Sequence, residues 1–168
     1  MGAFTGLKDA RRGFNSNKLR AGEYLVRIDK CEFFDTKMSG EKWKNTLTVV
    51  GTISGDHKVG EVAHVIFSMA NGQMVFQSNL KGFLAGVLGV SDEEIDEPSA
   101  TIARSEDSPL YGMVTRVIAT QRTSRDKKDK DGNPTTYVVY NWSPAFTPEE
   151  ITSAIGDEAV KRFFPNGL

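Results

Sequence analysis

The sequence predicts a mainly β fold, a small barrel of five strands with one helix inserted, and two observations support that prediction. Five segments have the apolar and β-branched composition of strands, and several of them alternate apolar with polar residues, as a strand with one buried face does. Between the third and fourth segments the apolar period lengthens to three or four residues, which is typical of an amphipathic helix. Together these features indicate an OB-fold-like Greek-key barrel with a helix between strands 3 and 4, followed by a C-terminal helical segment.

The expected strands cover residues 22–34, 43–53, 59–67, 110–120 and 135–142. In the first, Tyr24, Val26 and Ile28 share one face. In the second, an apolar face that begins with Trp43 opposes a row of lysine and threonine. A short turn at residues 38–41 joins these two strands, so we expect them to form a hairpin.

The expected helix covers residues 73–88, with Gly89 as its C-cap. A second, short helix is expected to begin after Ser91, with Glu94 completing a capping box. Thr147 and Pro148 open the C-terminal helical region, which Gly156 divides in two. The domain organisation is therefore a basic N-terminal arm at 1–20, a barrel at 21–145 and a C-terminal helical extension at 146–168.

The 168 residues carry a net charge of only −1, but the charge is unevenly distributed. Residues 1–20 hold five cations against one carboxylate, a net of +4. Residues 92–107 hold seven carboxylates against one arginine, a net of −6. Segregation of this kind can create a local basic surface on a nearly neutral protein, although two solvated segments without a partner are the plain alternative.

The single cysteine, Cys31, excludes an internal disulfide and favours a reducing, cytoplasmic location. No apolar run reaches the roughly 20 residues that a membrane-spanning helix needs. The two histidines and Cys31 lie far apart in the sequence, and no phosphate-binding or nucleophile motif occurs. We therefore expect no enzyme activity, no metal and no cofactor.

Binding of a single nucleic-acid strand requires cations for the phosphates and aromatic faces for the bases. Both fall in the loops that join strands 1–2 and 4–5, where an OB-fold presents its ligands. The second of these loops has a net charge of +2 and is followed by Tyr137, Tyr140 and Trp142. The predicted binding residues, with the arm included, are Arg11, Arg12, Lys37, Lys42, Trp43, Lys44, Arg122, Arg125, Lys127, Lys128, Lys130 and Tyr137.

Trp43 is the leading candidate for base stacking because Lys42 and Lys44 flank it. Its parity with Leu47 and Val49 favours the opposite interpretation, in which the indole belongs to the core. If the indole is core, the stacking platform is expected at Phe33, Tyr137 or Trp142.

The layout resembles the OB-fold single-stranded DNA-binding proteins of bacteriophages. The resemblance rests on GEYLVRIDKCEFF and WKNTLTVVGTI, then VGEVAHVIF and NGQMVFQSNLKGFL, and finally YGMVTRVIATQ and TTYVVYNW, over roughly residues 20–145. It implies binding of single-stranded DNA with little sequence specificity, in replication or recombination, and contacts with replication proteins.

One feature departs from that family. Many of its members end in an acidic tail, whereas this chain ends in KRFFPNGL, in which Phe163 and Phe164 could contact a partner or the barrel. The alternative function is a protein-interaction or virion structural module without nucleic-acid binding, and an oligomer is compatible with either.

Overall fold

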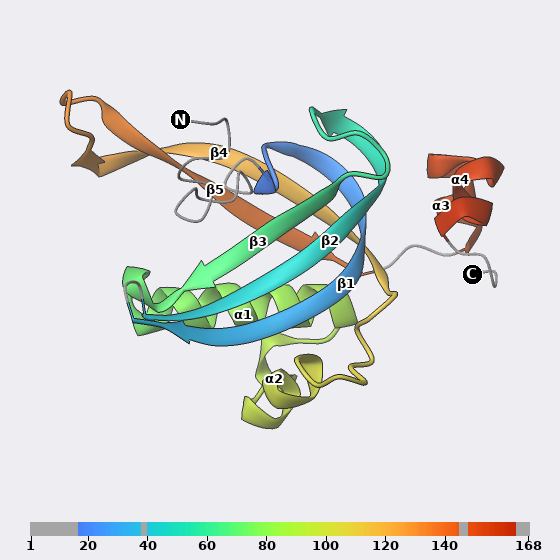
Figure 1. The fold of residues 1–168 in the computed structure, drawn as a ribbon, viewed down its shortest axis with the longest axis horizontal. Coiled ribbons are helices and arrows are strands. Elements are labelled where there is room, and N and C mark those ends of the chain that lie inside the picture. Colours follow the sequence, from blue (N-terminus) through green and yellow to red (C-terminus); the bar gives the residue numbers. More distant parts are fainter. Residues whose placement is uncertain (1–16, 38–39, 145–147, 164–168) are drawn as a thin grey trace, which may run out of the picture.

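The computed structural model describes residues 17–37, 40–144 and 148–163, and its centre is one antiparallel sheet of five strands (Figure 1). The strands are β1 (Gly22–Thr36), β2 (Gly40–Gly55), β3 (Val62–Ser68), β4 (Val114–Lys128) and β5 (Pro134–Ser143). Their order across the sheet is β3-β2-β1-β4-β5. The crossing from β3 over to β4 makes a Greek key, so the predicted mainly β, OB-fold-like barrel is confirmed.

The expected helix between strands 3 and 4 is confirmed as α1 (Gln73–Leu88), with Gly89 in the left-handed conformation at its C-cap. A 3-10 turn follows at Asp92–Glu94, where the Glu94 carboxylate accepts the Ser91 amide at 2.9 Å. The second helix, α2 (Glu97–Ala103), begins after Asp96, whose carboxylate caps it. Figure 1 shows α1 lying along one end of the barrel, with α2 on its far side.

The core lies between the inner face of the sheet and α1. The three shifts of register between β1 and β2 bend these long strands around the core. Phe83 of α1 meets Trp142 of β5 edge to face, with ring centroids 4.8 Å apart. The helix comes this close because Gly86 has no side chain, since a Cβ there would lie 2.6 Å from Trp142.

A second, small apolar cluster sits on the outer face of the sheet. Leu25, Val50 and Val114 project outward from three neighbouring strands and are covered by Ile151. Ile151 belongs to α3 (Pro148–Ile155), which is followed by α4 (Asp157–Phe163). The division of the C-terminal helical region at Gly156 is confirmed, because Gly156 lies between the two helices with a positive φ of 82°.

Residues 17–20, which we call the seam segment, lie between β3 and β5 at the open side of the barrel. The Leu19 amide donates to His64 of β3 at 2.9 Å, and Tyr140 of β5 donates its hydroxyl to the Leu19 carbonyl at 3.2 Å. The Leu19 side chain is only 1% exposed. Contacts with the barrel therefore begin before residue 21, where the sequence places the domain boundary.

A buried histidine holds the end of the seam segment. The Arg20 amide donates to Nε2 of His57 at 2.9 Å, so that nitrogen is unprotonated. The proton is on Nδ1, which lies 2.9 Å from the carboxylate of Glu61. This hydrogen bond is the main reason that the pKa of Glu61 lies below its usual value.

Strand β4 differs most from its expected bounds. It continues to Lys128, through residues expected to form a polar loop, because Arg122 and Thr123 still pair with Tyr137 and Thr136 of β5. At its other end it begins at Val114, since residues 110–112 form a turn. A further difference is Ile53, which has the parity of Val49 in the sequence but is 52% exposed. The register shift between Leu25 and Val26 places one extra residue in β2 after Val49, and this reverses the alternation beyond it.

Candidate nucleic-acid interface

The outer face of β1, β2 and β3 presents basic side chains beside apolar ones. In the sheet register, Lys42 of β2 is paired with Phe34 of β1, and Lys44 is paired with Ile66 of β3. Phe34 is 36% exposed and Ile66 is 37% exposed. We call these four residues, with the neighbouring His64, the outer basic face.

Three other cations of the sheet, all within the barrel, are already neutralised by a carboxylate. The pairs are Arg27–Asp29 at 2.8 Å, Lys30–Glu32 at 3.2 Å, and Arg116–Glu23. Lys42 and Lys44, in contrast, form no salt bridge with another residue in the described ranges. No salt bridge among the described residues therefore has to break when an anion approaches these lysines, although Glu32 lies opposite Lys44 in the register.

His64 lies beside Thr46 on the same face. Its pKa is lowered, first by burial and then by the positive charge of Lys44. Its Nδ1 is buried without a hydrogen-bond partner in the described part of the chain. Because Lys44 disfavours the imidazolium, an anion bound at Lys44 would relieve that repulsion and raise the pKa of His64.

The seam segment also reaches the outer basic face. Lys18 forms a parallel bridge with His64, and its side chain is exposed. The predicted binding residues Arg11 and Arg12 precede the seam segment in the sequence and lie outside the described residues.

The predicted stacking role of Trp43 is wrong for this structure. The indole is 1% exposed, and its Nε1 donates to the buried Asn45 at 2.8 Å. Trp43 lies on the inner face with Leu47 and Val49, as the alternation along β2 predicts. The register shifts of this hairpin all lie at residues 23–30 of β1, so no bulge near Trp43 turns the indole outward. Trp142, named as an alternative platform, is also buried, at 7% exposure.

The β4–β5 hairpin extends beyond the barrel, and Figure 1 shows its tip projecting at the upper left. Tyr137 is 50% exposed and lies opposite Arg122 in the register. A cation and an aromatic ring on the same face of a ribbon can meet a phosphate and a base together. The remaining predicted cations of the hairpin are all exposed: Arg125, Lys127, Lys128 and Lys130.

The carboxylate of Asp129 stabilises the tight turn at the hairpin tip. It accepts hydrogen bonds from the backbone amides of Asp131 at 2.9 Å and of Asn133 at 3.0 Å. Gly132 follows the turn with a φ of 80°. The Asp129 side chain is therefore held against the backbone and does not form a salt bridge with the lysines beside it.

The structure thus divides the predicted binding residues into two groups. Lys42 and Lys44 lie together on the outer basic face, with exposed Lys37 at the end of β1. Arg122 and Tyr137 lie together on the hairpin. Sequence reasoning missed the contributions of His64, Lys18 and Ile66, because their proximity to Lys44 depends on strand register, for which the sequence carries no local signal.

Other chemistry on the described residues is limited. Cys31 is buried, and burial, helped by the charge of Glu32, raises the pKa of its thiol to about 12, so the thiolate form is not populated at neutral pH. Among residues 17–37, 40–144 and 148–163, no three His, Cys, Asp or Glu side chains gather as a metal site would require. Within the same ranges, no helix is both long and apolar enough to cross a membrane.

Comparison with known proteins adds no assignment. No protein-family model matches the chain, and no curated protein is significantly similar to it.

Proposed function

We propose that the protein binds single-stranded DNA with little sequence specificity, as a replication or recombination protein of a bacteriophage acting in the cytoplasm of the host cell. The observation that carries the proposal is the outer basic face. There, Lys42 and Lys44 form no salt bridge with a described residue and lie beside the exposed ring of Phe34. Cations that follow a phosphate backbone next to an aromatic surface are what sequence-tolerant single-strand binding needs.

The β4–β5 hairpin supports the same function from a second position. Its five cations are exposed, and Tyr137 presents half of its side-chain surface beside Arg122. A single strand is flexible enough to contact both the sheet face and a projecting ribbon. Duplex DNA is stiffer and hides its base faces, so we expect it to bind more weakly.

The direct test is a fluorescence-anisotropy titration with labelled oligo-dT, oligo-dA and a duplex of equal length, each at two salt concentrations. We expect similar affinity for the two single strands and weaker binding of the duplex. The logarithm of the affinity should fall with the logarithm of salt by about 0.7 per neutralised phosphate. Three to six such contacts are expected, by rough analogy with sites of about 4–16 nucleotides per OB domain.

A pair of variants locates the binding surface. In Lys42→Gln/Lys44→Gln, two free cations are removed without disturbing a salt bridge among the described residues, so affinity and salt slope should both fall. Lys161→Gln, on exposed α4, is the matched control and should leave both unchanged. Affinity that does not depend on salt, or equal binding of duplex and single strand, would contradict the proposal and favour the protein-interaction or virion structural alternative.

A further inference from the structure

Strand β1 has one free edge over its second half. It pairs with β2 as far as Thr36, but its pairing with β4 ends at Arg27, opposite Val114. The last backbone contacts on that side join Ile28 to Gly112 and Met113. Among the described residues, positions 29–36 therefore have a strand neighbour on one side only.

The backbone groups that face this edge can be identified from Cys31. Its amide donates to the Tyr111 hydroxyl at 3.3 Å, and the same hydroxyl donates to the Cys31 carbonyl at 3.2 Å. Alternate residues of an antiparallel strand direct their N–H and C=O groups to the same edge. Phe33 and Asp35 therefore face the free edge, and no residue in the described ranges forms a further backbone hydrogen bond with them there.

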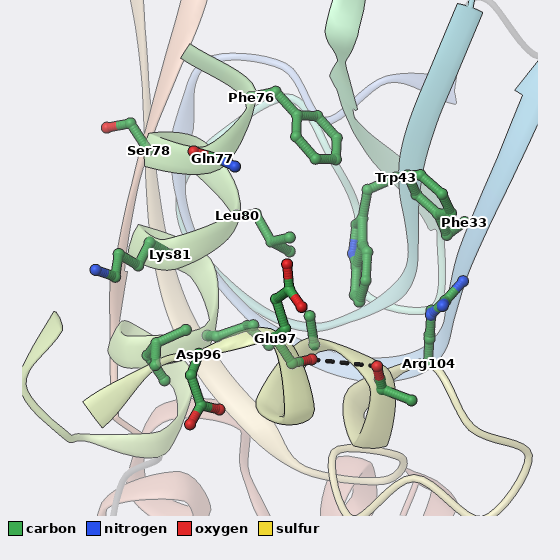
Figure 2. A pocket seen from close by; sticks show the side chains of 14 residues that line it. Phe33, Trp43, Phe76, Gln77, Ser78, Leu80, Lys81, Asp96, Glu97 and Arg104 are labelled. Atoms are coloured by element: carbon green, nitrogen blue, oxygen red, sulfur yellow. Dashed lines mark hydrogen bonds between the residues drawn. The ribbon is translucent and has the colours of Figure 1, made fainter. Parts of the chain in front are cut away.

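An apolar pocket of about 590 Å³ lies beside this edge, between β1, α1 and α2. Figure 2 shows Trp43, Phe76 and Leu80 directed into it, with Phe33 at one side. A second hollow of about 780 Å³ follows β1 on the other side of Phe33. The two share Phe33, Thr101 and Arg104 in their lining, so they form one groove along the free edge, which we call the β1–α2 groove.

The charge of the β1–α2 groove differs from that of the outer basic face. Five carboxylates line it against three cations. Two of these carboxylates, Asp29 and Glu32, already form salt bridges with Arg27 and Lys30, which leaves three carboxylates against two cations, a net charge of −1. The carboxylates are Asp29, Glu32, Asp96, Glu97 and Glu106, and the cations are Lys30, Lys81 and Arg104. One of the cations, Arg104, already lies over the Phe33 ring, 5.2 Å from its centroid. A phosphate backbone would be repelled here, whereas a segment that carries lysine or arginine would be attracted.

We propose that the β1–α2 groove binds an extended segment of a partner protein, which adds a strand to β1 at Phe33 and Asp35. Such a segment carries one large apolar side chain with lysine or arginine beside it. Its main chain pairs with the free edge, and alternate side chains point to opposite faces of the extended sheet. The apolar side chain enters the pocket over Leu80 and Phe76, and the basic side chains meet Glu97 and Glu106 at the rim.

This site adjoins the surface proposed for nucleic acid at Phe34, which lines the second hollow and also belongs to the outer basic face, but the two proposals rest on different groups. Lys42 and Lys44 face outward from β2, whereas Phe33 and Trp43 face the pocket on the inner side. The two surfaces also attract opposite charges. Each proposal can therefore fail without the other.

The test begins with a display library of random twelve-residue peptides selected on the full-length protein. We expect the selected peptides to share a large apolar residue flanked by lysine or arginine. Affinity of a selected synthetic peptide is then measured on two variants of one position. Asp35→Pro removes an amide that faces the free edge, while Asp35→Ala removes the same carboxylate and keeps the amide.

If the peptide adds a strand, Asp35→Pro should weaken its binding about tenfold relative to Asp35→Ala. Because the Asp35 amide points away from β2, the β1–β2 ladder stays intact in both variants, and their melting temperatures should agree. Equal affinity for the two variants would overturn strand addition. A selection that returns no peptide, or only acidic ones, would overturn the site.

A second pair of variants tests the charge. Glu97→Lys reverses a charge at the rim and should lower the affinity for the selected peptide several-fold. Glu93→Lys makes the same change outside the groove and should leave that affinity unchanged. Both variants should bind oligo-dT no more weakly than the original protein. A synthetic peptide of residues 1–16, which holds three cations and one carboxylate, is the last probe. If it competes as strongly as the selected peptide, the groove binds the N-terminal arm of this chain, from the same molecule or from a second copy, and the assignment to another protein is overturned.

Discussion

The β1–β2 hairpin and the β4–β5 hairpin both place aromatic residues among lysines and arginines. The first hairpin packs on the core of the barrel, whereas the outer half of the second has no core beneath it. The first runs between β3 and β4, and its inner row, which includes Trp43, packs in the core. The outer half of the second has left the barrel, so Tyr137 stays exposed in a similar local sequence. The layer beneath a strand therefore decides whether an aromatic ring beside cations stabilises the fold or remains free for a ligand.

The largest expected effect comes from truncating one aromatic residue in each hairpin. Trp43→Ala removes a fully buried indole and should lower the free energy of unfolding by roughly 3–5 kcal/mol. Tyr137→Ala removes an exposed ring and should change it by no more than about 0.5 kcal/mol. Urea unfolding measures both. A Trp43→Ala protein that keeps its stability but loses oligo-dT affinity would restore the stacking role that the structure denies.

The next effect concerns the cations of the β4–β5 hairpin. Replacing Arg122, Arg125, Lys127 and Lys128 together by glutamine should reduce the salt slope of oligo-dT binding by about 0.7 for each phosphate that these side chains neutralise in the original protein. Lys42→Gln/Lys44→Gln tests the other hairpin in the same assay. If only one of the two groups of substitutions changes the slope, the single-stranded DNA binds at that hairpin alone, and binding at both surfaces is refuted.

A smaller effect is expected from the exposed ring of Tyr137. Tyr137→Ala should weaken oligo-dT binding by about 1–3 kcal/mol if a base stacks on the ring. Tyr137→Phe keeps the ring and removes only the hydroxyl, so its affinity should match that of the original protein. A loss of the same size in both variants would assign the contribution to the hydroxyl and exclude stacking.

The smallest effect is a pH dependence through His64 on the outer basic face. Its lowered pKa means that the unfolded chain binds a proton first as the pH falls below the ordinary value of 6.5, so stability is lost in that range. Anion binding near Lys44 raises this pKa, so oligo-dT affinity should increase as the pH falls through the same range. His64→Gln should flatten both curves, measured by urea unfolding and by anisotropy. An affinity curve that is unchanged by the substitution would place the phosphates away from Lys44.

The fold could be predicted because its signals are local. The change of apolar period at Gln73 and the glycine at position 89 mark the bounds of α1, and the alternation from Gly22 marks the inner face of β1. The sequence predicts β4 too short, since residues 122–128 are polar and remain in the strand only because β5 continues beside them.

The candidate site could be predicted only in part. Charge in the two hairpins is visible in the sequence, whereas the burial of Trp43 depends on its parity with Leu47 remaining intact up to the end of the strand. Lys18, Lys44 and His64 lie close together although they belong to the seam segment, β2 and β3, and no local pattern in the sequence predicts that proximity. The free edge at Phe33 depends on where β4 stops, and nothing within β1 records that.

The seam segment has a consequence for the order in which the chain folds. Leu19 is synthesised before β1, yet the hydroxyl that donates to its carbonyl belongs to Tyr140, 121 residues later. The open side of the barrel therefore stays unfinished until β5 has left the ribosome, and until then the seam residues can contact β3 and the turn that holds His57 but not β5. Contacts so distant along the chain slow folding, so closure of the seam is expected to be a late step of folding.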